Sequence, residues 1–85
     1  MKKYRKKPLV IEAVQWNGDN HLDIAAIKGV HGYLIEPHSG HITVTAESGC
    51  FMAHKGDWII KGIKGELYSC KSEVFEATYD EVLNT

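Results

Sequence analysis

Residues 9–16 (LVIEAVQW) are rich in strand-forming side chains and place them on two faces. Ile11 and Ala13 fall on one face, and Val14 and Trp16 fall on the other. Successive residues of a β-strand point to opposite sides of a sheet, so this spacing is typical of a strand. The pattern therefore predicts a first strand that ends at Trp16.

A turn and then a short helix are predicted next. Residues 17–20 (NGDN) are turn formers, and Asp19 or Asn20 is placed to cap a following helix. The apolar side chains of residues 22–27 recur at nearly helical spacing, and Lys28-Gly29 is a C-terminal signal. The helix should therefore end near residue 28.

Recurring glycines divide the next forty residues into short segments typical of a meander of hairpins. The predicted strands are 33–36, 41–45, 50–53, 57–61 and 66–70. The pair joined by the loop 62–65 is the clearest hairpin. The expected fold class is α+β, a small antiparallel sheet or partly closed β-barrel of about five to six strands with one or two short helices.

The last segment, residues 72–82, leaves two alternatives open. Ser72 has the form of a helix cap, and Phe75, Tyr79 and Val82 follow at i, i+4 and i+7 spacing. Thr78 and Tyr79 also favour strands. The pattern does not decide between helix and strand here.

Length and cysteine content set limits on the organisation. The chain has 85 residues, which allows one domain, 1–85, with a basic lead at 1–7. A core this small gives marginal stability, so we expect a homo-oligomer. Two cysteines, Cys50 and Cys70, are too few for a disulfide scaffold and are expected to be reduced thiols.

Hydropathy indicates neither a signal peptide nor a membrane span. The apolar run after the basic lead stops at Glu12, and no apolar stretch reaches about 18 residues. We therefore expect a soluble, cytoplasmic protein that does not contact membranes.

The net charge of −1 hides an asymmetry between the two ends. The first seven residues hold five of the ten basic side chains, whereas the last twenty hold five acidic side chains and a single basic one, Lys71. These ends could attract each other within a subunit or between subunits. The rest of the chain has few cations, which disfavours a nucleic-acid interface.

No set of residues indicates a metal site or a catalytic centre. His38 and His41 flank a turn, Cys50 and His54 are four apart, and no second tight pair completes a tetrahedral set. The cysteines lie on predicted strands and the carboxylates are scattered. We expect no cofactor, no metal and no enzymatic activity.

The most distinctive stretch is 56–62 (GDWIIKG). Its glycine permits a tight turn, Asp57 can bond back to the turn backbone, and Trp58 begins a strand, which a purely structural role would explain. A ligand-binding role would use indole rings for stacking and lysines for an anion. The candidate ligand-binding residues are Trp16, Asn17, Asp57, Trp58, Lys61, Lys64 and Tyr68.

Three segments, 7–18, 54–62 and 65–79, resemble the PGDYG family of short bacteriophage and prophage proteins. The name-giving motif differs here, with Lys55 in place of proline and Trp58 in place of tyrosine. The resemblance implies a phage origin and a life in the host cytoplasm, and it brings no known activity.

Small accessory proteins of phages often block a host defence, and by analogy we expect such a role for this chain. The leading hypothesis is a non-enzymatic oligomeric sponge for a small nucleotide-type signal. Trp16, Trp58 and Tyr68 would stack on it, and Lys61 and Lys64 would contact its phosphates. The alternative is a protein-binding module that masks a host factor or assists virion assembly.

Overall fold

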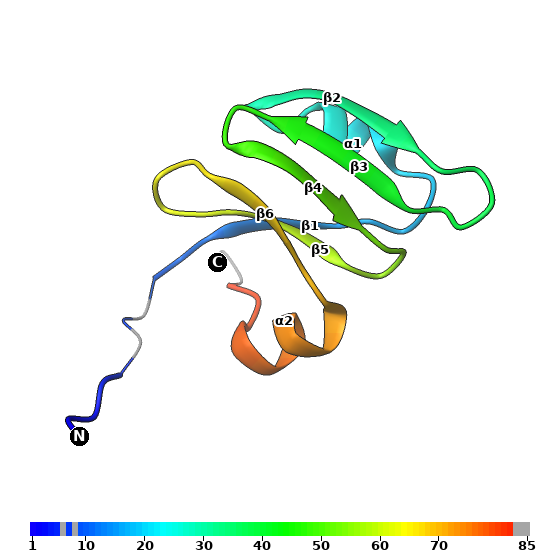
Figure 1. Cartoon of the computed structure of the whole chain (residues 1–85). Coiled ribbons are helices and arrows are strands. Elements are labelled where there is room, and N and C mark those ends of the chain that lie inside the picture. The colour runs from blue at the N-terminus through cyan, green and yellow to red at the C-terminus, as the bar shows by residue number, and fades with distance from the viewer. Residues whose placement is uncertain (6, 8, 83–85) are drawn as a thin grey trace.

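The computed structural model describes residues 1–5, 7 and 9–82. It consists of short strands and two short helices (Figure 1). In chain order the elements are β1 (Glu12–Gln15), α1 (His21–Ala25), β2 (Val30–Ile35), β3 (Ile42–Ala46), β4 (Gly49–Ala53), β5 (Trp58–Lys61), β6 (Leu67–Cys70) and α2 (Ser72–Thr78). In the described part of the chain, neither helix has the length and hydropathy needed to cross a membrane.

The strands form two antiparallel sheets of three. The first sheet has the order β1-β5-β6, and the second sheet has the order β2-β3-β4. The second sheet is a simple meander, whereas β1 pairs with β5 across more than forty residues of sequence. In Figure 1 the first sheet crosses below the second, and α2 lies at the far end of the molecule from α1.

The hydrophobic core lies between the two sheets and is closed by α1. On β3 the buried Ile42, Val44 and Ala46 alternate with exposed threonines, so one face of the second sheet points inward. Helix α1, which packs against β2, adds the fully buried Ile24. The core cluster comprises Trp16, Ile24, Ile42, Val44, Ala53 and Ile59.

The predicted α+β class is confirmed in its coarse form, but the expectation of a partly closed barrel is wrong. Among the described residues the two ladders stay separate. Strands β4 and β6 approach each other through side chains, with Ser69 Oγ donating to the Met52 carbonyl at 3.0 Å. Side-chain bonds of this kind do not continue a ladder, so the structure is two stacked sheets.

Most predicted hairpins are confirmed. The loop 62–65 joins β5 to β6 with Trp58 opposite Cys70, and the turns at 37–40 and 47–48 join β2, β3 and β4. The first strand is shorter than predicted, because only residues 12–15 pair with β5. Both cysteines are free thiols, as expected.

The helix ends differ from prediction in their capping. Asn20 occupies the N-cap of α1 but makes no side-chain cap bond, because its side chain bonds Gln15 and Asn17 within the preceding loop. Ser72 is the first residue of α2 rather than its cap, and Lys71 takes the cap position. In the segment 72–82, for which the sequence left helix and strand open, the residues up to Thr78 are helical.

Candidate functional site

The first sheet has a second face, which points away from the core toward α2. The register sets Ala13 opposite Ile60 and Ile60 opposite Tyr68, so these side chains share that face. Trp58 lies two residues before Ile60 and therefore points the same way. The chain turns back after β6, and α2 lies over this face (Figure 1).

Stacked aromatic rings attach α2 to the sheet. The rings of Trp58 and Phe75 lie 4.1 Å apart between centroids and 11° from parallel. Phe75 and Tyr79, four residues apart, contact each other at 5.0 Å and 34°. Stacking of this kind adds about 0.5–1.5 kcal/mol beyond the area that it buries. The stack therefore accounts for the docking of a helix that has no fully buried residue.

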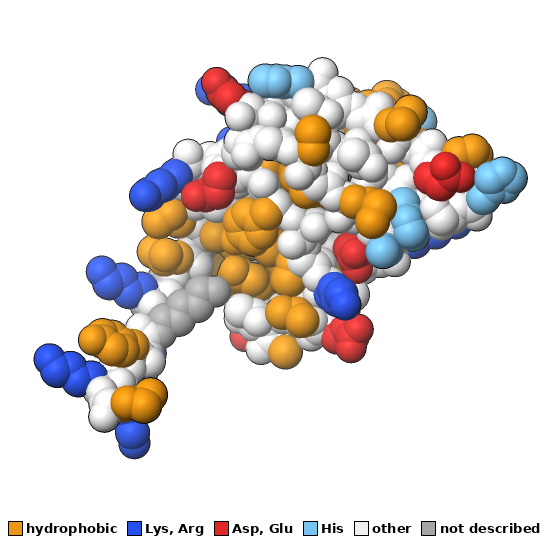
Figure 2. Space-filling model, viewed as in Figure 1, with side chains coloured by type: hydrophobic (Ala, Val, Ile, Leu, Met, Phe, Trp, Pro, Cys, Tyr) orange, Lys and Arg blue, Asp and Glu red, His pale blue; other side chains and the backbone are white. Residues whose placement is uncertain are grey.

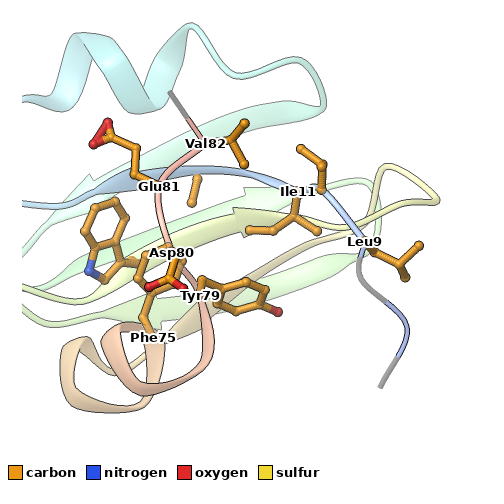
Figure 3. Close-up of a pocket in the computed structure, with 10 residues that line it drawn as sticks. Leu9, Ile11, Phe75, Tyr79, Asp80, Glu81 and Val82 are labelled. Carbon is orange, nitrogen blue, oxygen red and sulfur yellow. The ribbon is translucent and has the colours of Figure 1, made fainter. Parts of the chain in front are cut away.

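A cavity of about 470 Å³ opens beside this stack, and we call it the aromatic groove (Figure 3). One wall is the stretch that leads into β1, including Leu9 and Ile11, and the floor carries Trp58 and Phe75. The other wall is the segment 79–82, which runs on from α2 across the groove. The lining is Leu9, Val10, Ile11, Ala13, Trp58, Phe75, Tyr79, Asp80, Glu81 and Val82.

Charge at the aromatic groove is negative. Among the described residues, the charged side chains that line it are those of Asp80 and Glu81, and both are exposed. Glu73 and Glu76 add two more exposed carboxylates on the adjacent α2. Opposite charges attract and like charges repel over several ångströms, so these carboxylates favour a cationic ligand over a phosphate.

A second hollow of about 230 Å³ adjoins the groove and shares Leu9, Ile11 and Tyr79 with it. Tyr68 lines this hollow and is hydrogen-bonded to Tyr79. Desolvation, this hydrogen bond and the nearby charge of Glu66 raise the pKa of the Tyr68 hydroxyl above its usual value. The shift keeps the Tyr68 hydroxyl protonated further into the alkaline range than an ordinary tyrosine.

Apolar side chains surround both hollows at the surface. Figure 2 shows hydrophobic side chains gathered between the arm, β6 and α2. The exposed apolar residues that line the two hollows are Leu9, Val10, Ile63, Tyr68 and Val82. Contiguous apolar surface of this kind marks interaction sites in small proteins.

Three of the seven predicted site residues have structural roles. Trp16 is 0% exposed, and its Nε1 donates to the Gly40 carbonyl at 2.8 Å, so it offers no ring face to a ligand. Asn17 accepts backbone N–H bonds from the two residues of its own turn, 19 and 20. Asp57 accepts from the His54 N–H at 2.9 Å, the bond back to the turn that the sequence predicted.

The structure separates the predicted lysines from the predicted stacking residues. Lys61 is three positions after Trp58 on β5, so it lies on the opposite face, in a hollow against α1. Lys64 lines another hollow, beside the turn between β3 and β4. Trp58 and Tyr68 share the face toward α2, but neither Lys61 nor Lys64 lines the hollows that these two rings line.

Sequence reasoning missed the residues that complete the groove. The i, i+4 spacing of Phe75 and Tyr79 indicated a helical stripe, but it did not say which sheet face that stripe would cover. Asp80 and Glu81 were noted only as part of an acidic end. The missing information was the pairing of β1 with β5, which sets Leu9 and Ile11 beside the C-terminal segment.

Within the described residues no cluster of three or more His, Cys, Asp or Glu side chains is suited to hold a metal ion. His41, of the pair His38 and His41, instead stacks its ring on that of His54, of the pair Cys50 and His54. The two ring centroids are 3.9 Å apart.

The chain matches no family model, no curated protein and no solved structure. The resemblance to the PGDYG proteins therefore stays a prediction based on motifs.

Proposed function

We propose that this chain is a non-enzymatic protein-binding module, and that its aromatic groove binds an extended segment carrying apolar and basic side chains. The observation that carries this proposal is the combination of a stacked aromatic floor with the carboxylates of Asp80 and Glu81. Following the phage resemblance, the bound segment would belong to a host factor or a virion component.

The groove has the features that concentrate binding energy in a protein interface. Aromatic side chains dominate interface hot spots because they bury much area with few rotatable bonds. Trp58 and Phe75 already stack on each other in the free protein, so these two side chains lose little conformational entropy on binding. The surrounding exposed apolar side chains would exclude water from such a contact.

The nucleotide-sponge hypothesis has less support from the same geometry. A nucleotide needs cations beside its stacking surface, and here the groove has carboxylates instead. A sponge would require Lys61 or Lys64 from another copy to complete each site. The nucleotide hypothesis is therefore our second candidate, and the experiment below tests it alongside the first.

Titration of Trp58 fluorescence tests the proposal, because this indole lines the groove. We expect short synthetic peptides that combine tyrosine with lysine or arginine to bind saturably, and matched peptides with glutamate to bind more weakly. Glu81→Lys removes one exposed ion pair and adds a repulsion, so it should reduce affinity for the basic peptides at least about two- to fivefold, the value of one exposed pair.

Glu47→Lys is the matched control, since Glu47 is equally exposed but lies at the turn between β3 and β4. It should leave peptide affinity unchanged. Equal binding of basic and acidic peptides, or an equal effect of the two substitutions, would contradict the proposal. Saturable binding of a cyclic dinucleotide with no binding of any peptide would favour the sponge.

A further inference from the structure

The described residues of the N-terminal arm, 1–5 and 7, are all exposed. Figure 1 shows residues 1–5 lying away from both sheets and from α2. The arm combines exposed apolar groups with cations: Tyr4 is 90% exposed and is flanked by Lys3 and Arg5 (Figure 2). The tyrosine ring and its flanking cations are therefore all available to a partner surface.

The chemistry of the arm matches the chemistry of the aromatic groove. The groove offers aromatic faces to a tyrosine, and its exposed carboxylates, Asp80 and Glu81, offer partners to lysine and arginine. The two surfaces have opposite charge and both are exposed in one copy. Complementary charge of this kind both selects a partner and speeds its association.

The arm is better placed to reach the groove of a second copy than the groove of its own chain. The arm leaves the fold at Leu9, which is itself a wall of the groove, and it leads outward from there. Seven extended residues reach about 23 Å, enough to cross into a neighbouring subunit. With two-fold symmetry each copy would give one arm and receive one, so both grooves would be filled and the assembly would close.

We propose that the N-terminal arm of a second copy docks in the aromatic groove, with Tyr4 against the Phe75 and Tyr79 rings and the cations of the arm against Asp80 and Glu81. This inference rests on the proposed function, since it names one occupant of the same groove. It makes the protein an arm-exchanged homodimer in which any outside partner must displace the arm.

A charge-swap experiment on the full chain tests the exchange. One variant reverses the arm (Lys2→Glu, Lys3→Glu, Arg5→Glu, Lys7→Glu), and another reverses the groove (Asp80→Lys, Glu81→Lys). Alone, each variant has like charges on its arm and its groove, so we expect the dissociation constant of its dimer to be at least about tenfold higher than that of the wild type. All changed side chains are exposed, so folding should be preserved.

Mixing the two variants is the decisive test of the exchange. Each arm then faces a groove of opposite charge in the other variant, so native mass spectrometry should show a heterodimer in place of two monomers. Lys28→Glu, an exposed reversal on the far side of the first sheet from α2, is the control and should dimerise like the wild type. A monomeric wild type, or a mixture that stays monomeric, overturns the inference.

Peptide binding separates this outcome from failure of the proposed function. The arm-reversed variant keeps an intact groove, so it should bind a synthetic peptide of residues 2–9 at least as tightly as the wild type does. Binding of that peptide by a chain whose wild type is monomeric would overturn the exchange and leave the groove as a peptide site. Absence of binding by any basic peptide would overturn both.

Discussion

At the scale of single residues, the two tryptophans differ in what their indole nitrogens contact. Trp16 is fully buried, its Nε1 donates to the Gly40 carbonyl, and its backbone bonds Gly56 and Asp57. The Nε1 of Trp58 is also buried, but it has no hydrogen-bond partner among the described residues. Trp16 therefore connects the two sheets through a hydrogen bond, whereas Trp58 acts through its ring faces.

Substitution by phenylalanine should separate these two roles. Trp16→Phe leaves the buried Gly40 carbonyl without its donor and leaves space in the core, so we expect the free energy of unfolding to fall by about 2–4 kcal/mol. Trp58→Phe removes a buried N–H that has no acceptor and keeps a ring to stack on Phe75, so its loss should be smaller. Urea denaturation of both variants measures the difference. Equal losses would mean that the bond to Gly40 contributes little.

At the scale of elements, α2 is the weakest part of the fold that builds the groove. It has seven residues, no side-chain cap bond and no fully buried side chain. Short helices are marginal on their own, so the aromatic stack with Trp58 has to hold this one in place. The stability of the groove therefore depends on how firmly this stack holds α2 against the sheet.

A better cap should stabilise α2 locally. Lys71 stands at the N-cap with φ −65° and ψ 143°, an extended geometry from which a serine hydroxyl can accept a backbone N–H of the first turn. Lys71→Ser should therefore increase the free energy of local opening by about 1 kcal/mol. Hydrogen exchange of the α2 amides measures this change. Lys71→Ala removes the same charge without adding a cap, so equal protection in both variants would contradict the capping argument.

The elements also show which parts of this structure a sequence can predict. The hairpin from β5 to β6 was predicted because the turn chemistry of residues 62–65 lies beside the strands that it joins. The pairing of β1 with β5 has no such local signal, since more than forty residues separate Val14 from its partner Ile59. The groove depends on that pairing, and so Trp58 is the one residue of its described lining that the sequence predicted to belong to a site.

Burial was equally hard to assign from local pattern. The alternation along the first strand correctly put Val14 and Trp16 on one face, and both face the core. The same pattern could not say that this face would be covered by a second sheet and the opposite face by α2. Trp16 was therefore assigned to a ligand, although the closure of the core leaves its ring no exposed surface.

At the scale of the whole molecule, charge is distributed along the chain rather than balanced locally. The cations of the arm project from one end, and the carboxylates of α2 and of residues 80–81 lie by the groove. The net charge of −1 therefore hides two opposite surfaces. Two copies can neutralise both surfaces at once, and assembly would add to the stability of a small core.

Thermal stability should consequently depend on protein concentration. If the folded state is a dimer and the unfolded state is monomeric, each tenfold rise in concentration raises Tm by roughly 3–6 °C for a domain of this size. Salt screens the contacts between arm and groove, so this dependence should shrink as ionic strength rises toward about 1 M. Differential scanning calorimetry across a concentration series, with and without salt, measures both effects.

The arm-reversed variant is the control for that series, because its core is unchanged and only its assembly should be lost. Its Tm should lie below the wild-type value at high concentration and should not change on dilution. A wild-type Tm that is equally insensitive to dilution would mean that one copy is stable by itself. The opposite charges at the two ends would then serve an outside partner, and the groove would be open to it without competition from the arm.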